Sequence, residues 1–432
     1  MRKVTKRAVA ALLVAVLVIF GCCVYIYRYL KDGAFWAGYF GNENITSTSI
    51  LTDRNGTVLA TISSGEISYA DSSTMREACY QLLGDGTGNI STGALSCFSG
   101  RLSGFSYIFG TTRPKDTSLE LTVDADLQVT AYEAMGSQNG AVIACNYKTG
   151  EILCTVSTPA QDPLYPSDEP EEGTYLNKGI SSTLTPGSTF KLVTLSAALE
   201  TVPNIYSEEF TCEGSTVING VEINCTGEHG TEDIYDALAN SCNVAFAEIT
   251  QEVGSDALSS YVDKLGFTSS HDINGIPTAA GSFVKADDGT ADLSWSGIGQ
   301  YQDLVCPFSE LRLVSAIANH GRLAEPTLLV RSLNVQETQL LKASTADAMK
   351  KFMRNNVESV YGDSTFPGLT MCGKTGTAEV GDGDNHSWFT GFLDDEEHPY
   401  AIVVVVEHGG YGLSNAGAIA NTVLQEAVAN GD

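Results

Sequence analysis

The chain beyond residue 119 shows two hydrophobic patterns, one typical of buried strands and the other typical of helices. Segments of strand length that are predicted as strands lie at 141–145, 151–157, 370–378, 387–393 and 401–407, and the last of them (AIVVVVE) is almost wholly apolar. Apolar residues recur at helical spacing over 125–135, 417–430 and most of 188–264, including 232–238 and 244–253. Strands at both ends with helices between them imply one sheet assembled from distant segments. We therefore predict that residues 119–432 form one folding unit.

The N-terminal region contains an uncharged apolar stretch at 8–27. About 20 such residues are enough to span a bilayer. Four basic residues lie among residues 1–7, and positive charge before a span favours a cytoplasmic N-terminus. We predict a cytoplasmic tail at 1–7, an uncleaved transmembrane anchor at 8–30, and an extracytoplasmic location for the rest of the chain.

The segment between the anchor and the folding unit, 31–118, carries a hairpin signal but little other periodicity. Apolar runs within 50–62 flank Asn55-Gly56, and this dipeptide is the strongest short-range signal for a hairpin. The remainder is rich in Ser, Gly and Tyr. We interpret 31–118 as a small pedestal domain, too short for a second enzyme.

Charge narrows the choice of partners. The 432 residues include 52 acidic and 24 basic side chains, for a net charge of −28. Such a chain repels nucleic acid phosphates and gains nothing from an anionic membrane surface. We therefore expect no nucleic acid partner.

Eleven cysteines are present, an odd number, so at least one is unpaired. Cys212 and Cys225 flank a turn at Asn219-Gly220, which brings them into reach of each other. A zinc site that added His229 to this pair lacks an evident fourth ligand. We therefore expect Cys212 and Cys225 to form a disulfide, or to be simply buried thiols, and not to bind a metal.

A serine and a lysine three residues apart open one predicted helix. Pro186-Gly187 marks a loop, after which Ser188 and Lys191 lie on one helical face. A Lys amine activates a serine hydroxyl when its own pKa is depressed. The same spacing at Ser282 and Lys285 falls in a predicted loop, which does not fix two side chains on one face.

Two further motifs have a suitable structural context. Ser241-Cys242-Asn243 precedes a predicted helix, and Lys374-Thr375-Gly376-Thr377 lies on or beside a predicted strand. The same tripeptide patterns also occur, without such context, at Ser137/Asn139, Ser332/Asn334 and Lys148-Thr149-Gly150.

Residues 368–375 match the phosphate-binding pattern G-x-x-x-x-G-K-[ST] in full. That motif needs a helix directly after it, whose N-terminus holds the phosphates. The tract 381–385, Gly-Asp-Gly-Asp-Asn, breaks any such helix and adds carboxylates. We therefore exclude nucleotide binding here.

The order Ser-x-x-Lys, Ser-x-Asn, Lys-Thr-Gly resembles that of penicillin-binding proteins and class A β-lactamases. The longer strings PGSTFK, NSCN and GKTGTAE identify the chain as a member of class B of the penicillin-binding proteins, similar to the monofunctional PbpA-like members. Further similar segments cover almost everything after the anchor: 53–56, 121–159, 298–300, 318–321 and 386–392. The resemblance implies an α/β fold of α+β type, with a mainly antiparallel five-stranded central sheet flanked by helices.

The resemblance also implies a function, a peptidoglycan D,D-transpeptidase that β-lactams inhibit covalently and that needs no cofactor. Its implied catalytic residues are Ser188 as nucleophile, with Lys191, Ser241, Asn243 and Lys374. Thr375, Gly376 and Thr377 would bind substrate, and the backbone N–H groups of Ser188 and Thr377 would form the oxyanion hole.

The sequence leaves other functions open. A D,D-carboxypeptidase differs only in passing the acyl group to water instead of to an amine. A β-lactamase or a catalytically silent penicillin-binding scaffold is disfavoured. The family also suggests a membrane glycan polymerase as partner. A role in division, elongation or sporulation is not assigned.

Overall fold

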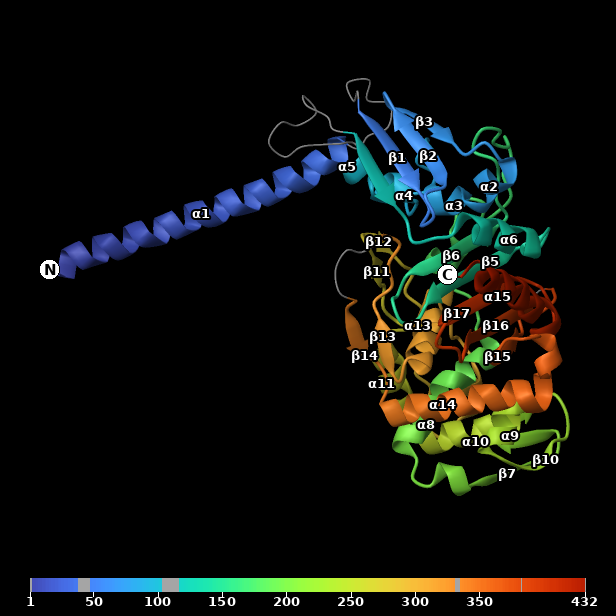
Figure 1. The fold of residues 1–432 in the computed structure, drawn as a ribbon. Helices are drawn as coiled ribbons and strands as arrows, with labels where there is room; N and C mark the ends of the chain where they lie inside the picture. The colour runs from blue at the N-terminus through green and yellow to red at the C-terminus, as the bar shows by residue number, and fades with distance from the viewer. Residues whose placement is uncertain (1, 38–46, 103–115, 331–334, 382, 432) are drawn as a thin grey trace.

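The computed structural model describes residues 2–37, 47–102, 116–330, 335–381 and 383–431. The long helix α1 Arg2–Ala37 extends away from a body that has two sheets of four or more strands (Figure 1). Its segment Val4–Tyr29 is long and apolar enough to cross a membrane, and none of this segment is buried against the protein. The predicted anchor therefore coincides with a lipid-compatible helix.

The smaller sheet lies at the end of the body nearest α1. β1 and β2 pair antiparallel around the turn that contains Asn55-Gly56, which confirms the predicted hairpin. The strand order is β3-β2-β1-β4, with β4 parallel to β1. Its elements are β1 Thr48–Thr52, β2 Val58–Ser63, β3 Glu66–Tyr69 and β4 Thr117–Glu120, with α2 Ser73–Ala78, α3 Tyr80–Leu83, α4 Ala94–Cys97 and α5 Ser99–Leu102. The predicted domain boundary between 118 and 119 falls inside β4, and the division into domains stays a prediction.

The larger sheet has five strands, all antiparallel, in the order β15-β16-β17-β5-β6. The two edge strands of this sheet, β15 and β6, therefore come from opposite ends of the predicted folding unit, as expected. The strands are β5 Gly140–Asn146, β6 Ile152–Thr158, β15 Met371–Ala378, β16 His386–Leu393 and β17 Tyr400–Val406.

Both faces of this sheet are covered, which explains the uninterrupted apolar run of β17. Ala401, Val403 and Val405 face one core, whereas Ile402 and Val404 face the other. The first core is closed by α8, α10, α13 and α14, and the second by α6 and α15 (Figure 1). The helices are α6 Ala125–Met135, α7 Lys178–Ser181, α8 Lys191–Thr201, α9 Ile234–Ala239, α10 Asn243–Val253, α11 Ser255–Leu265, α12 Ala291–Ile298, α13 Pro307–Ala318, α14 Ala343–Asn356 and α15 Ala418–Asn430.

The prediction of mainly helical structure over 188–264 is wrong for one part. The segment 209–233 forms four short strands, with β7 paired to β10 and β8 to β9. Asn219 and Gly220 both have positive φ, which closes the β8–β9 hairpin as the dipeptide suggests. These strands are four residues long and largely exposed, so they carry little hydrophobic periodicity. They are β7 Glu209–Cys212, β8 Ser215–Ile218, β9 Val221–Asn224 and β10 Gly230–Asp233.

Minor elements complete the fold. They are the short strands β11 Asp272–Ile273, β12 Ile276–Pro277, β13 Arg322–Ala324 and β14 Glu337–Gln339, and the irregular helical turns η1 Gly187–Phe190, η2 Ile205–Ser207, η3 Val357–Tyr361, η4 Asp363–Thr365 and η5 Leu413–Gly417.

Candidate functional site

The predicted nucleophile lies in the turn η1, directly before α8. Ser188 is partly exposed there, whereas Lys191, one turn later, is fully buried. Gly187 has a φ of +57°, and a Cβ atom at this position would lie 2.9 Å from the carbonyl oxygen of Thr377. Only glycine therefore lets this turn approach β15 so closely.

Lys191 is directed toward the Ser-x-Asn motif. Its Nζ donates to Asn243 Oδ1 at 2.8 Å, to the Ser241 carbonyl at 2.6 Å and to Ser241 Oγ at 3.2 Å. Burial lowers the pKa of the Lys191 amine to about 8. Ser188 Oγ itself makes no hydrogen bond with any residue that the structure describes. Lys191 thus follows Ser188 by one turn, and its described hydrogen bonds go to Ser241 and Asn243 and not to Ser188.

The second predicted amine, Lys374, approaches Ser241 from the sheet. It lies on β15 and donates to Ser241 Oγ at 3.0 Å and to the Thr375 carbonyl at 2.8 Å. Burial and the neighbouring Lys191 charge lower its pKa well below the usual lysine range. Because both amines donate to Ser241 Oγ, its own hydroxyl hydrogen remains available to a third group.

β15 forms one edge of the large sheet and packs against the serine turn. A Cβ atom at Gly376 would lie 2.9 Å from the Pro186 carbonyl oxygen. Asn356 Nδ2 donates to the Gly373 carbonyl, and the Thr375 N–H donates to Tyr361 OH, so these backbone groups point away from β16. Backbone direction repeats every two residues in a strand, which turns the Thr377 N–H toward the same outer edge.

The structure thus brings the predicted residues of all three motifs to one place, where the start of α8, the start of α10 and β15 meet. The decoy patterns lie elsewhere. Ser282 and Lys285 are in a loop, where Lys285 pairs with Asp256. Lys148 is in the β5–β6 turn and pairs with Glu396. Residues 368–375 lead into and along β15, and the next described element along the chain is the strand β16 and not the helix that phosphate binding needs, as predicted. Ser332/Asn334 lies outside the described residues.

Sequence reasoning missed Glu310. This carboxylate is buried on α13, and its Oε1 accepts a hydrogen bond from Thr189 Oγ1 at 2.7 Å. Burial raises the pKa of Glu310 to about 7, although the nearby Lys374 opposes the shift. A single carboxylate in the first turn of a largely apolar helix was the available signal.

Tyr361 was also missed. Its hydroxyl accepts from the Thr375 N–H at 3.1 Å and lies 3.2 Å from Thr375 Oγ1. It therefore fixes the rotamer of a predicted substrate-binding threonine. Tyr361 belongs to the irregular turn η3, and nothing in its sequence context points to this contact.

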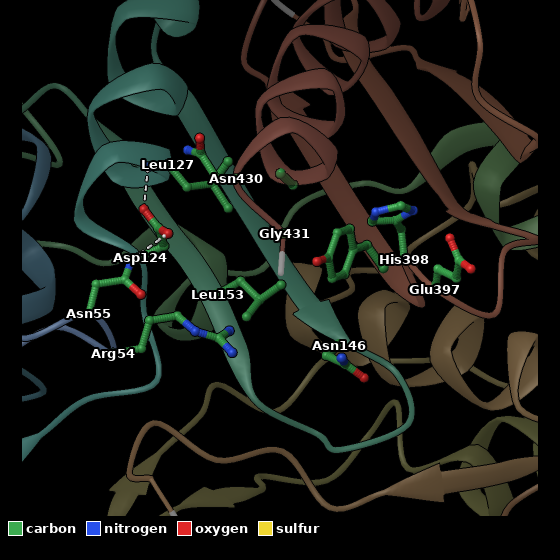
Figure 2. Close-up of a pocket in the computed structure, with 12 residues that line it drawn as sticks. Arg54, Asn55, Asp124, Leu127, Asn146, Leu153, Glu397, His398, Asn430 and Gly431 are labelled. Carbon is green, nitrogen blue, oxygen red and sulfur yellow. Dashed lines mark hydrogen bonds between the residues drawn. The ribbon is translucent and has the colours of Figure 1, made fainter.

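A separate polar pocket of about 470 Å³ lies between the hairpin of the smaller sheet, the start of α6 and the C-terminal residues (Figure 2). None of the predicted catalytic residues lines it. Its polar groups already have partners: Asn55 Nδ2 donates to Asp124 Oδ2, Asp124 caps α6, and Arg54 pairs with Glu151. These contacts join the two sheets and do not form an alternative active site.

Comparison with known proteins agrees with this geometry. The peptidoglycan D,D-transpeptidase PbpA of Mycobacterium tuberculosis is 28% identical over 372 residues, covering 77% of this chain and 75% of the relative. Stage V sporulation protein D of Bacillus subtilis is 30% identical over 346 residues, covering 72% of this chain and 53% of the relative.

Solved structures show the same fold. Penicillin-binding protein A from M. tuberculosis, as an imipenem acyl-enzyme complex, superposes with a TM-score of 0.78 at 24% identity, over 90% of this chain and 100% of that chain. The D,D-transpeptidase domain of a peptidoglycan glycosyltransferase from Eggerthella lenta gives a TM-score of 0.78 at 23% identity, over 89% and 99%. A family model described as the penicillin binding protein transpeptidase domain matches residues 140–425. Since this match spans most of the chain, the protein belongs to the penicillin-binding protein transpeptidase family.

Proposed function

We propose that this protein is a class B peptidoglycan D,D-transpeptidase that works through an acyl-enzyme on Ser188. The observation that carries the proposal is the convergence of two buried amines, Lys191 and Lys374, on Ser241 Oγ beside the turn of Ser188. Names of the relatives support the substrate class, since PbpA of M. tuberculosis is a peptidoglycan D,D-transpeptidase.

Acylation begins when Ser188 Oγ attacks the carbonyl carbon of the penultimate D-alanine. Its proton passes to the neutral amine of Lys191, whose lowered pKa makes this form available near neutral pH. The negative charge that develops on the carbonyl oxygen is stabilised by the N–H groups of Ser188 and Thr377. Removing one such donor typically costs about 2.7–4 kcal/mol.

Collapse of the tetrahedral intermediate breaks the C–N bond and releases D-alanine. The leaving amine takes the hydroxyl proton of Ser241, which is replaced from Lys191 through their hydrogen bond. An amine of a neighbouring stem peptide then attacks the ester carbon, and Ser188 regains its proton. The cross-link is complete, and the enzyme returns to its starting state.

Two features favour binding of an extended peptide with a free carboxylate. The outer edge of β15 offers the Thr377 backbone for strand addition. Lys374 supplies positive charge, and the hydroxyls of Thr375 and Thr377 supply donors for the terminal carboxylate. A β-lactam carries a similar carboxylate and acyl carbonyl, so it acylates Ser188 in the same position.

The location belongs to the same proposal. The helix α1 would anchor the protein in the cell membrane with its basic N-terminus in the cytoplasm and the catalytic body outside. A membrane glycan polymerase would supply the strands to be cross-linked, and support for this partner comes from the family resemblance alone.

The test uses the detergent-solubilised protein, a stem peptide ending in D-alanyl-D-alanine, and a peptide amine as acceptor. We expect D-alanine release together with a cross-linked peptide product, and loss of both in Ser188→Ala. Ser282→Ala, from the decoy Ser-x-x-Lys pair, is the matched control and should keep full activity. D-alanine release without cross-linking under saturating acceptor would assign a carboxypeptidase instead.

A further inference from the structure

Three cysteines and one histidine that are far apart in sequence meet directly behind the Ser-x-Asn motif. They are Cys212 at the end of β7, Cys225 just after β9, His229 just before β10, and Cys242 at the N-cap of α10. Their ligand atoms all lie within 4.8 Å of one another. Cys242 provides the fourth ligand that sequence analysis did not find.

The spacing of these atoms matches a tetrahedral metal site. Zn–S bonds of about 2.3 Å and Zn–N bonds of about 2.0–2.1 Å place neighbouring ligands about 3.8 Å apart for two sulfurs and about 3.6 Å apart for sulfur and nitrogen. Here Cys225 Sγ lies 3.9 Å from Cys242 Sγ and 3.6 Å from His229 Nδ1. A disulfide needs sulfurs about 2.05 Å apart, and all these cysteines are free thiols.

The surroundings suit thiolates. The Asn243 N–H points at Cys225 Sγ at 3.1 Å, and the Ala245 N–H points at Cys242 Sγ at 3.4 Å. Both donors belong to the first turn of α10, whose N-terminus favours negative charge. Cys212 and Cys242 are buried, and Cys225 and His229 are half-buried, so the cluster is shielded without being inaccessible to an ion.

We propose that Cys212, Cys225, His229 and Cys242 bind one Zn²⁺ ion in a closed Cys₃His structural site. Thiolate ligands select soft or borderline ions, and four protein ligands leave no position for substrate. Binding displaces the thiol protons to solvent, and the neutral imidazole coordinates through Nδ1. The ion therefore has no part in acyl transfer.

The site would position the catalytic motif. Cys242 separates Ser241 from Asn243, the two residues that hold the Lys191 amine. Ser241 has a φ of +54°, a conformation that a serine rarely adopts and that its surroundings must maintain. A metal bond at the next residue ties this backbone to the short strands β7 to β10, which have few buried apolar side chains of their own.

The test is the zinc content of the full-length protein, purified in detergent without chelator and measured by plasma mass spectrometry. We expect about one zinc per chain in the wild type and in Cys97→Ser, which removes a thiol outside the cluster. Cys212→Ser and His229→Ala should lose the metal, whereas His229→Cys, which restores a ligand, should keep it. Absence of zinc from the wild type after dialysis against Zn²⁺, or its retention in both ligand variants, would overturn the proposal.

Alkylation of the cysteines in the wild-type protein distinguishes bound zinc from a disulfide and from free thiols, without relying on any variant. If zinc is bound, the three cluster thiols should resist alkylation in the native protein and react once a strong chelator is added. Protection that is removed by a reductant and not by a chelator would instead demonstrate a disulfide and contradict the proposal. Reaction of all three thiols before either reagent is added would contradict it equally.

Discussion

At the scale of single residues, the proposed chemistry depends on the proton that Lys191 carries. Its amine is fully buried and has a pKa near 8, so a minority of molecules hold it neutral at pH 7. Because the base must be neutral to accept a proton from Ser188, the pKa and the role are compatible.

The first prediction concerns pH. A lysine whose pKa is lowered gains its neutral form as pH rises through that value, so the acylation rate constant should increase about ten-fold between pH 7 and pH 9 and then level off. Lys191→Ala should slow acylation by about 10²–10⁴-fold at every pH. Stopped-flow measurement with a chromogenic β-lactam checks both, and Lys285→Ala serves as control. A rate that falls with rising pH would exclude Lys191 as the base.

The second prediction concerns Glu310. Its pKa in the folded protein is about 7, above its usual value, so the folded state binds more protons than the unfolded state between about pH 4.5 and pH 7. Its ionisation therefore lowers stability as pH rises through this window. Glu310→Gln should increase the free energy of unfolding by about 1–3 kcal/mol at pH 8 and change it little at pH 4.5.

Denaturant unfolding at the two pH values measures this difference. Acylation should be slower in Glu310→Gln, because the variant removes a negative charge near Lys374. Equal stabilisation at both pH values would mean that packing, and not the ionisation of Glu310, causes the effect.

Glu310 and Tyr361 also show which site residues sequence reasoning reaches. Ser188, Lys191, Ser241 and Lys374 are predicted from the order of three short motifs and from the family resemblance that this order carries. Glu310 and Tyr361 contact those motifs only after α13 and η3 pack against them. No local pattern encodes that packing.

At the scale of elements, one buried carboxylate connects the two sheets. Asp53 Oδ1 accepts from the N–H groups of Asn55 and Thr57, which closes the β1–β2 turn. Its Oδ2 accepts from the N–H of Ala125, the first residue of α6. The Asp53 side chain thus fixes both the β1–β2 hairpin of the smaller sheet and the start of α6, a helix that packs on the larger sheet.

The third prediction follows from these bonds. Asp53→Ala leaves three N–H groups without their partner, and a buried donor without a partner costs about 1–3 kcal/mol. We expect a loss of stability of at least this size, detected as a lower midpoint in thermal or denaturant unfolding. Asp126→Ala, which removes an exposed carboxylate in the same helix turn, is the control and should change the midpoint little. Equal effects of the two substitutions would contradict the structural role of Asp53.

Elements with strong local signals were predicted well, and those without were not. The strand β17 is an uninterrupted apolar run, and α6 has Asp124 as its N-cap, so hydrophobicity and capping suffice for these elements. The β8–β9 hairpin follows the Asn219-Gly220 signal, whereas β7 and β10 are short and partly exposed and are placed by pairing with each other across that hairpin. Sequence periodicity cannot register such pairing.

At the scale of the whole molecule, one apolar helix and a strongly acidic body predict an asymmetric arrangement about a membrane. The segment Val4–Tyr29 follows a basic N-terminus, and the net charge of the chain is −28. Because basic residues next to a membrane span are retained on the cytoplasmic side, the proposed orientation has the N-terminus in the cytoplasm and the acidic body outside.

The fourth prediction is this topology. In intact spheroplasts, added protease should digest the body and leave only a short membrane-bound N-terminal fragment, detected with an N-terminal tag. Replacing the four basic residues among 1–7 by neutral ones should weaken this orientation. A body that stays protected until the membrane is broken would reverse the proposed orientation.

The central claim is that Ser188 is the nucleophile of an acyl-enzyme, and intact mass after incubation with a penicillin tests it most directly. The account predicts one persistent adduct on the wild-type protein and on Ser282→Ala, with no adduct on a folded Ser188→Ala variant. An adduct on Ser188→Ala would contradict the assignment of the nucleophile. A wild type that hydrolyses the drug without a lasting adduct would contradict the transpeptidase itself and indicate a β-lactamase.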